Sequence, residues 1–180
     1  MDFQGSKTFE NLMSAFAGEC QAFMAYTIYA NQADKKGLAP LTNLMNETAA
    51  NEKEHAEAFF KRINNGGDGQ LPSPIEGLKR AIKSERFEAI EKYKDFERIA
   101  HEEGFDSIAE LFRKVRHIEE RHMKHFEELL TQFDNETLYT SDHRIAWVCS
   151  KCGNVEYGTN PPEKCPVCEH EGTYYEREIK

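Results

Sequence analysis

The feature that most constrains the fold is an internal repeat in which a helical pattern carrying possible metal ligands occurs twice. Glu52 and His55 form a Glu-x-x-His pair, and Glu119 and His122 form the same pair 67 positions later. Further matches at this offset include Ala33 with Ala100, Gly37 with Gly104, Leu44 with Leu111, and Phe59 with Phe126. A repeat of this kind predicts two halves of the same architecture.

Apolar periodicity predicts four helices, over residues 6–36, 38–65, 74–103 and 105–133. Gly37 and Gly104 stand where the first and third helices should end, as C′ glycines. Each glycine is followed at once by another helical pattern, so each half is expected to be a helical hairpin. The stretch 64–74 is rich in Asn, Gly and Pro and predicts the crossover between the hairpins.

The carboxylates and histidines of these helices predict a di-metal site. Residues at positions i and i+3 share a helix face, so each Glu-x-x-His pair projects together. Glu19 and Glu85 match at an offset of 66 and lie on apolar faces of the leading helices, where an ionised carboxylate is costly unless it is paired or bound to metal. One Glu from each of two helices and a Glu-x-x-His from each of the other two is the ligand set of ferritin-like di-iron bundles. A single pair of this type would more simply be a solvated surface motif, but two at a repeat offset favour metal.

Glu88 breaks the symmetry of the two halves. It lies one turn after Glu85, whereas the residue three positions after Glu19 is Ala22. Glu88 is therefore a fifth candidate carboxylate, although the spacing alone favours an ordinary exposed glutamate.

Four cysteines near the end of the chain predict a second metal site. Cys149 and Cys152 form one Cys-x-x-Cys knuckle, and Cys165 and Cys168 form another. Four thiolates suit zinc or a single iron in tetrahedral geometry, and a segment of about 35 residues needs such a staple to fold. The fifth cysteine, Cys20, is expected to be a small core residue and not a ligand.

These patterns predict a mainly α chain with a small C-terminal domain of short strands and loops. We expect a four-helix bundle over residues 1–135, a linker over 136–145 and a metal-stapled domain over 146–180. The formal net charge of −9, with no basic stripe, argues against nucleic acid as a partner. No apolar run reaches 18 residues and the N-terminus has no basic segment, so we expect a soluble, cytoplasmic protein without a membrane partner.

In these motifs the chain resembles the rubrerythrins, over nearly its whole length and in the order of their domains. The segments that carry the resemblance are Phe16–Glu19, Asn51–His55, Ser84–Glu88, Ile118–His122 and the two cysteine knuckles. The resemblance implies a ferritin-like di-iron bundle followed by a rubredoxin-like domain. The cofactors would be two irons with an oxo or hydroxo bridge and one iron bound by the four cysteines.

The resemblance also implies a role for each ligand. Glu52 and Glu119 would bridge the irons, and Glu85 and His122 would be terminal ligands of one of them. The other iron would be held by Glu19, with Glu88 and His55 alternating as its last ligand. Carboxylate suits ferric iron better and imidazole suits ferrous iron better, which gives this alternation a physical basis. The tyrosines implied beside the ligands are Tyr26 and Tyr93.

The function expected from this resemblance is a peroxidase that reduces hydrogen peroxide to water and protects against oxidative stress. Electrons would arrive through the rubredoxin-like iron from a rubredoxin or an NAD(P)H-dependent reductase, because the chain has no dinucleotide-binding fingerprint. We also expect a homodimer in which electrons cross between subunits and in which the crossover permits exchange of helices. The alternatives are a ferroxidase or iron-handling protein, and a non-enzymatic module stabilised by zinc.

Overall fold

The computed structural model describes residues 2–64 and 69–177. The chain forms two compact units, one ending at Ser73 and the other beginning at Pro74. Part of the expected crossover, residues 65–68, and the last residues of the expected C-terminal domain, 178–180, lie outside the described residues.

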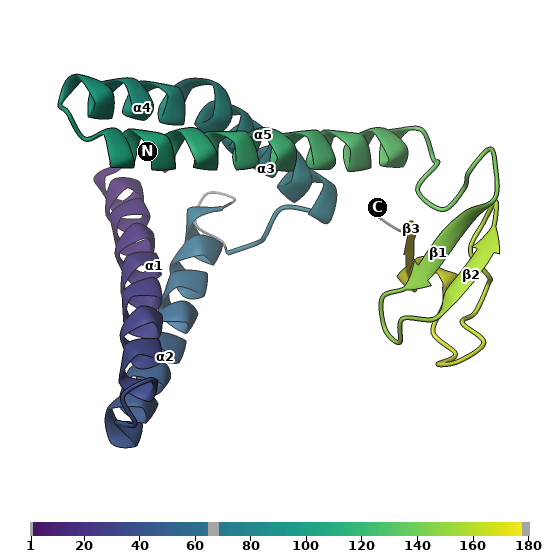
Figure 1. Ribbon diagram of the computed structural model, residues 1–180, viewed down its shortest axis with the longest axis horizontal. Coiled ribbons are helices and arrows are strands. Elements are labelled where there is room, and N and C mark those ends of the chain that lie inside the picture. The colour runs from purple at the N-terminus through teal and green to yellow at the C-terminus, as the bar shows by residue number, and fades with distance from the viewer. Residues whose placement is uncertain (1, 65–68, 178–180) are drawn as a thin grey trace. The chain divides into compact units, whose positions relative to one another are not determined.

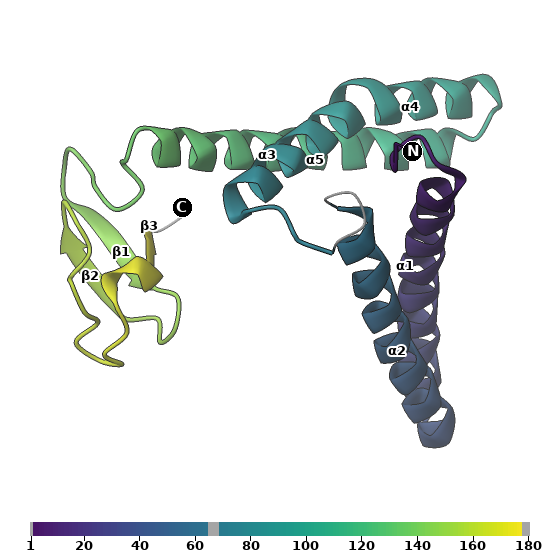
Figure 2. The same cartoon turned by 180° about the vertical axis from the view of Figure 1, so that it is seen from behind.

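The first unit is a helical hairpin of α1 (Lys7–Asp34) and α2 (Ala39–Ile63). The two helices lie side by side in both views (Figures 1 and 2). Ser6 caps α1, where its hydroxyl accepts a hydrogen bond of 3.2 Å from the backbone N–H of Phe9. Buried alanines on both helices let the two backbones approach closely, and these are Ala30, Ala33, Ala49 and Ala56.

The second unit begins with a hairpin whose first arm is interrupted. The arm consists of α3 (Pro74–Phe87), a π-helical turn η2 (Glu88–Lys92) and α4 (Tyr93–Glu102), and it packs along α5 (Asp106–Asp134). The predicted helix over 74–103 is therefore present, and the structure adds a π-helical turn at η2 within it. There the N–H of Tyr93 bonds to the carbonyl of Glu88, five residues back, instead of four.

Both hairpins turn in the same way, as the glycine pattern predicts. Gly37 has φ 68° and Gly104 has φ 82°, values that favour glycine. In the first turn the N–H of Leu38 bonds to the carbonyl of Ala33 at 3.1 Å, and in the second Phe105 bonds to Ala100 at 2.8 Å. These six-to-one bonds are those of a Schellman motif, which satisfies the last carbonyls of a helix.

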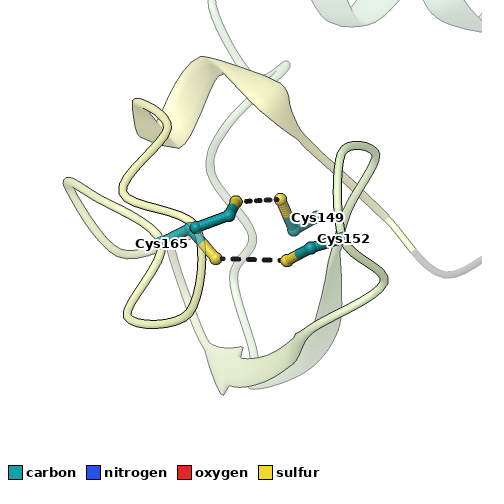
Figure 3. A group of neighbouring side chains, drawn as sticks. Cys149, Cys152 and Cys165 are labelled. Carbon is teal, nitrogen blue, oxygen red and sulfur yellow. Dashed lines mark hydrogen bonds between the residues drawn. The ribbon is translucent and has the colours of Figure 1, made fainter.

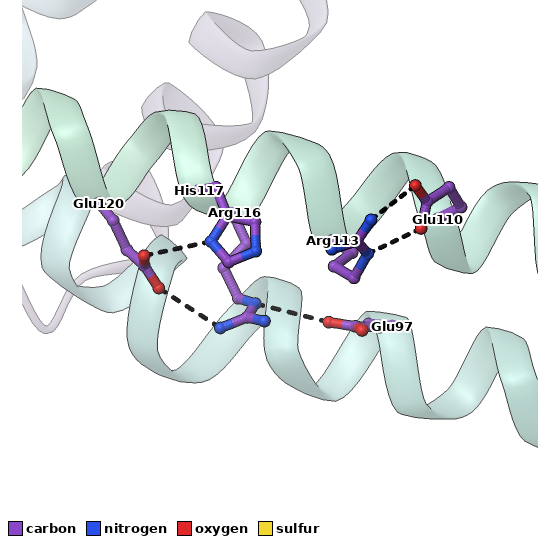
Figure 4. Close-up of polar contacts among 6 residues, drawn as sticks. All are labelled: Glu97, Glu110, Arg113, Arg116, His117 and Glu120. Carbon is purple, nitrogen blue, oxygen red and sulfur yellow. Dashed lines mark hydrogen bonds and ion pairs between the residues drawn. The ribbon is translucent and has the colours of Figure 1, made fainter.

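Charged side chains link α4 to α5 (Figure 4). Arg116 of α5 is only 22% exposed and reaches Glu97 of α4 at 3.5 Å, and on its own helix it pairs with Glu120 at 3.3 Å. His117 also contacts Glu120, at 3.3 Å. A half-buried guanidinium with partners on both helices fixes the register of this hairpin more firmly than an exposed pair would.

The trailing helices carry exposed apolar side chains at repeat-related positions near their starts. The matched pairs are Leu38 with Phe105, Leu41 with Ile108, and Leu44 with Leu111, each between 42% and 58% exposed. Large apolar side chains in matched rows are typical of surfaces that pack against further protein.

The C-terminal part of the second unit is a small antiparallel sheet. Its strands are β1 (Ile145–Cys149), β2 (Val155–Gly158) and β3 (Tyr175–Arg177), in the order β2-β1-β3. A 3-10 turn, η3 (Gly172–Tyr174), leads into β3. Trp147 lies on the central strand β1 and is fully buried, and its indole N–H donates a hydrogen bond of 3.1 Å to the carbonyl of Gly158.

The expected linker is bound to this sheet domain. The N–H of Ser141 donates to the carbonyl of Thr159 at 2.7 Å, and Arg177 donates to the carbonyl of Thr137 at 2.8 Å. The predicted fold class, mainly α with a small C-terminal β domain, is confirmed, while the exact domain bounds stay a prediction. Within residues 2–64 and 69–177, no helix is long and apolar enough to cross a membrane.

Candidate metal centres

The first hairpin brings together three of the expected ligands. Ligand atoms of Glu19, Glu52 and His55 all lie within 4.8 Å of one another. The Nδ1 atom of His55 lies 2.8 Å from an oxygen of Glu52, so the Glu-x-x-His pair is joined directly. Because α1 supplies one carboxylate and α2 supplies the other two groups, the packing of the hairpin itself creates the cluster.

The second hairpin repeats this arrangement. Glu85, Glu119 and His122 again have ligand atoms within 4.8 Å of one another. The Nδ1 atom of His122 lies 2.8 Å from Glu119 and 3.6 Å from Glu85. Two glutamates and one histidine thus converge in both units, with the leading helix supplying one group and the trailing helix supplying two.

The electrostatics of the two clusters show that each is short of positive charge. A hydrogen bond with Glu52 raises the pKa of Glu19, and burial and the charge of Glu52 add to the shift. Burial is the largest cause of the raised pKa of Glu85, followed by a hydrogen bond with Glu119 and the charge of Glu119. Carboxylates that hydrogen-bond to one another must share a proton, and a bound cation removes that requirement.

The hydrogen bonding of one carboxylate oxygen indicates whether a metal ion fits the second cluster. The Oε2 atom of Glu85 is buried and, within the described residues, has no hydrogen bond of normal length, because the Nδ1 atom of His122 lies 3.6 Å from it. A buried carboxylate oxygen without a partner is costly, and coordination to a cation would satisfy it. Together with two carboxylates and an imidazole in each cluster, this orphaned oxygen fits a pair of iron ions.

Glu88 lies outside these clusters. Its carboxylate accepts a hydrogen bond of 3.0 Å from the ammonium of Lys92, one turn further along the same arm. The charge of Glu88 nevertheless contributes to the raised pKa of Glu85, so the two carboxylates are electrostatic neighbours. The structure thus places Glu88 beside the second cluster, held by a lysine that sequence analysis did not single out.

The two candidate tyrosines are half-buried on the leading arms. Tyr93 directly follows η2, and its ring stacks on Phe112 with centroids 6.1 Å apart and contacts Phe96 edge-on at 6.0 Å. The Lys92 ammonium lies 5.4 Å from the centre of the Tyr93 ring. Tyr26 is the residue of α1 that matches Tyr93 at the repeat offset of 67.

The four cysteines of the sheet domain converge as a tetrathiolate site (Figure 3). The sulfurs of Cys149 and Cys168 are 3.7 Å apart, those of Cys152 and Cys165 are 3.6 Å apart, and all four lie within 4.8 Å. These distances are far beyond the length of a disulfide bond, about 2.0 Å. Four sulfurs placed about 2.3 Å from a central ion would be about 3.8 Å apart, which matches the observed spacing.

The two knuckles have the same backbone path. The N–H of Gly153 bonds to the carbonyl of Cys149 at 2.8 Å, and the N–H of Glu169 bonds to that of Cys165 at 2.9 Å. Both Gly153, with φ 76°, and Glu169, with φ 62°, adopt the left-handed conformation. The turns aim the cysteines of each knuckle at those of the other.

Hydrogen bonding and burial shift the pKa values of two of the thiols, Cys165 and Cys152, in opposite directions. Although burial opposes it, hydrogen bonds from the Tyr175 hydroxyl and from the backbone N–H groups of Cys168 and Val167 lower the pKa of Cys165 to about 6. At Cys152 a backbone hydrogen bond from Asn154 favours the thiolate, but burial and the other sulfurs raise the pKa to about 12. Four thiolates so close together need a cation to coexist, so the donor set fits a single metal ion.

Cys20 is exposed, so the expectation that it is a core residue is wrong for the hairpin. It lines an apolar groove on α1 and α2 together with Phe16, Phe23 and Phe60. In the part of the chain that the structure describes, it belongs to no group of candidate metal ligands.

Helical hairpins with repeated carboxylate–histidine clusters, joined to a tetrathiolate domain, define a class of non-haem iron proteins. A family model described as rubrerythrin matches residues 10–73 and 76–151, and a model of the rubrerythrin rubredoxin-like domain matches residues 147–176. The chain belongs to the rubrerythrin family, whose members are generally oxidoreductases and typically take electrons from rubredoxin-type donors.

Curated relatives agree with this assignment. The chain is 37% identical to rubrerythrin-1 of Clostridium acetobutylicum, with 96% of this chain and 95% of the relative covered. It is 36% identical to the rubrerythrin of Clostridium perfringens, with the same coverage. A solved structure of mixed-valence nigerythrin covers 99% of this chain and 94% of its own, at 26% identity and a TM-score of 0.35. The family assignment rests on the sequence matches.

The cofactors that fit are two irons at the carboxylate–histidine ligands and one at the cysteines.

Proposed function

We propose that the chain is a peroxidase that reduces hydrogen peroxide to two molecules of water with two electrons and two protons. The observation that carries the proposal is the repeated cluster of two carboxylates and one imidazole, with the orphaned buried oxygen of Glu85 in the second copy. Within the same chain, the tetrathiolate site supplies a means of re-reduction. A ligand set for two metals and a one-electron carrier are the parts that such a reaction requires.

The ligand roles proposed follow the family pattern. Glu52 and Glu119, the first residues of the two Glu-x-x-His pairs, would hold both metals. Glu85 and His122 complete the ligands of one metal, and their 3.6 Å separation supports this pairing. Glu19 binds the other metal, with His55 and Glu88 as its exchangeable ligands.

When bound, two ferrous ions would supply the two electrons that the reduction of hydrogen peroxide requires. The residues of the chain would then have two tasks, to balance the charge of the metals and to limit the access of water. The carboxylates balance the added positive charge as the metals are oxidised, and Glu88 can join them as an extra anionic ligand. The rings of Tyr26 and Tyr93, which are half-buried, are proposed to lie beside the ligands and to limit the access of water.

The rubredoxin-like domain is proposed to hold iron and to pass electrons singly. Hydrogen bonds from backbone N–H groups to Cys165 stabilise thiolate charge, and the burial of Trp147 and Tyr175 keeps the site partly dry. A site that holds zinc would be colourless, so visible absorption distinguishes iron from zinc in protein expressed with ample iron. The variants Cys149→Ser and Cys168→Ser then test whether the cysteines bind the iron. Each change should abolish the visible thiolate-to-iron absorption and leave the helical circular dichroism intact. Colour that survives both changes would show that the tetrathiolate assignment is wrong.

The oxidant separates the peroxidase from the second candidate, a ferroxidase, which the same type of ligand cluster favours. We expect the reduced protein to react faster with hydrogen peroxide than with dioxygen under matched conditions. Stopped-flow absorbance after anaerobic reduction measures both rates. Equal or faster consumption of dioxygen would support the ferroxidase and contradict the peroxidase.

Electrons are proposed to reach the bundle from a rubredoxin or an NAD(P)H-dependent reductase and to cross between the subunits of a homodimer. Helix α5 continues for twelve residues from His122 to Asp134, about 18 Å of helix at about 1.5 Å per residue. The linker begins only there, so transfer within one chain would have to cover this length. The exposed apolar rows at the starts of α2 and α5 support packing against further helices, including helices exchanged between chains.

The test of this route mixes two inactive variants. One lacks the tetrathiolate iron through Cys149→Ser, and the other lacks the di-iron ligands through Glu52→Ala with Glu119→Ala. After subunit exchange, mixed dimers should regain peroxidase activity through one intact pair of centres. Verified mixed dimers without activity would exclude transfer between subunits.

A further inference from the structure

The π-turn η2 lies where the two halves of the repeat lose their register. Glu19 and Glu85 match at an offset of 66, whereas Tyr26 and Tyr93 match at 67, so one extra residue lies between Glu85 and Tyr93. Helix α1 is α-helical throughout Lys7–Asp34, while the second arm forms η2 at Glu88–Lys92. A π-turn absorbs one additional residue without ending a helix, and such turns frequently occur at functional sites.

An ion pair found only in the second half spans this turn. The ammonium of Lys92 donates to the Glu88 carboxylate at 3.0 Å, with side chains 34% and 27% exposed. The matching residues of α1 are both alanines, Ala22 for Glu88 and Ala25 for Lys92. The hairpin that has the extra carboxylate therefore also has a cation to bind it.

This pair differs from an ordinary surface pair in its surroundings. An exposed pair at i and i+4 contributes little to stability because water screens it. Here both side chains are mostly covered, and the ammonium also lies 5.4 Å from the centre of the Tyr93 ring, a cation–π arrangement that restricts it. Beside Glu85, a second carboxylate without a counter-ion would be repelled, and Lys92 supplies that counter-ion.

We propose that Lys92 is a positioning residue that binds the Glu88 carboxylate away from the metal ligands and so competes with the metal for it. The proposal rests on the di-metal site of the proposed function and adds the group that holds Glu88 when it is not a ligand. An ammonium on a flexible stem suits this role because it gives up a carboxylate more easily than the bidentate fork of an arginine does.

The test measures binding of Mn(II), a cation that prefers carboxylate and imidazole to thiolate. Free Mn(II) is counted by electron paramagnetic resonance during titration of the full-length protein. In Lys92→Met, Glu88 is released from its competitor, and Mn(II) should bind about three- to fivefold more tightly, the range expected for loss of a pair worth up to about 1 kcal/mol. Lys92→Gln should behave as Lys92→Met does, and Lys92→Arg should bind within about twofold of the wild type.

Two controls isolate the pair. Lys114→Met removes a lysine that pairs with Glu110 at 3.4 Å, also at i and i+4 but away from the clusters, and should leave Mn(II) affinity unchanged. In a Glu88→Gln background, Lys92→Met should change affinity by less than about twofold, because no carboxylate remains to be released. A gain that persists in that background would come from general repulsion and would overturn the proposal.

Failure of the proposal is distinguishable from failure of the proposed function. If the wild type binds Mn(II) but Lys92→Met and Lys92→Gln bind no more tightly, only the role of Lys92 is wrong. If the wild type binds no Mn(II), or if binding survives Glu52→Ala with Glu119→Ala, the di-metal site itself is wrong and the role of Lys92 falls with it.

Discussion

The two helical hairpins are built alike, and their main difference in backbone structure lies at one place. Both end their leading arm in the same Schellman bonds, and both join the two members of the Glu-x-x-His pair at 2.8 Å. Among the described residues, the second arm contains a π-turn that α1 lacks, and an additional carboxylate, Glu88, lies beside the second cluster. The comparison teaches that a hairpin can take up one inserted residue, and have an additional carboxylate beside its candidate ligands, while its turn and its Glu-x-x-His pair keep the same geometry.

The hairpins also differ in how far they shield their carboxylates. A neighbouring carboxylate is the main cause of the raised pKa of Glu19, whereas burial is the main cause for Glu85. His55 is 57% exposed and His122 is 42% exposed. The first hairpin thus has the more accessible histidine, which agrees with His55 being the one proposed to exchange.

The largest expected effect is the loss of metal binding when either hairpin loses a proposed ligand, and it tests whether the two hairpins contribute equally to the site. Glu52→Ala and Glu119→Ala each remove a proposed bridging ligand, so each should weaken metal binding by at least about 100-fold and abolish peroxide turnover. Iron content and Mn(II) titration measure the loss, with Glu110→Ala on α5 as a control. A variant that keeps full metal content would show that its hairpin does not contribute to the site.

Glu88→Ala should separate turnover from metal binding. Six of the seven proposed ligands remain, so iron content should stay near that of the wild type while peroxide turnover falls by about 10–100-fold. Iron analysis and stopped-flow kinetics measure the two quantities. Unchanged turnover would show that Glu88 is an ordinary surface glutamate, despite its place beside Glu85.

Deletion of Ile90 should make the second arm resemble the first. With one residue fewer, the segment from Glu85 to Tyr93 has the seven-residue spacing that separates Glu19 from Tyr26 in a regular α-helix. We expect the metal content to remain and turnover to fall by about tenfold, because Glu88 then takes the orientation of Ala22. Loss of helical circular dichroism would instead show that the arm needs the π-turn in order to fold.

The smallest effect concerns the two turns. Gly37→Ala and Gly104→Ala place a side chain at positive φ, where an added Cβ meets nothing within 4 Å, so only backbone strain opposes the change. Each should destabilise its hairpin by about 1 kcal/mol, and the two costs should be equal. Chemical denaturation monitored by circular dichroism measures them. Clearly unequal costs would mean that the turns are not equivalent.

Much of this protein could be read from residue spacing. The helix ends at Gly37 and Gly104 follow from the need for positive φ, and the cysteine knuckles follow from ligand chemistry. The two Glu-x-x-His pairs follow from helical periodicity, because i and i+3 share a face in any α-helix. Such features depend on local geometry that any chain with these residues must adopt. The roles of the individual ligands stay predictions.

The π-turn and the Lys92 ion pair could not be read in this way. The change of offset from 66 to 67 was visible in the sequence, but a one-residue irregularity could equally be a loop, a kink or an imperfect match. Periodicity predicts which face a residue occupies and does not predict which partner its side chain chooses there.

The sequence by itself therefore determined the helical hairpins, the repeated ligand types and the tetrathiolate domain, because helix geometry and metal chemistry act over a few residues. Only the tertiary structure decided that the extra residue is absorbed in η2, that Glu85 has a buried oxygen without a hydrogen bond, and that Lys92 holds Glu88. These outcomes depend on how α3, η2 and α4 pack along α5, since burial and side-chain pairing are set by neighbours distant in the chain.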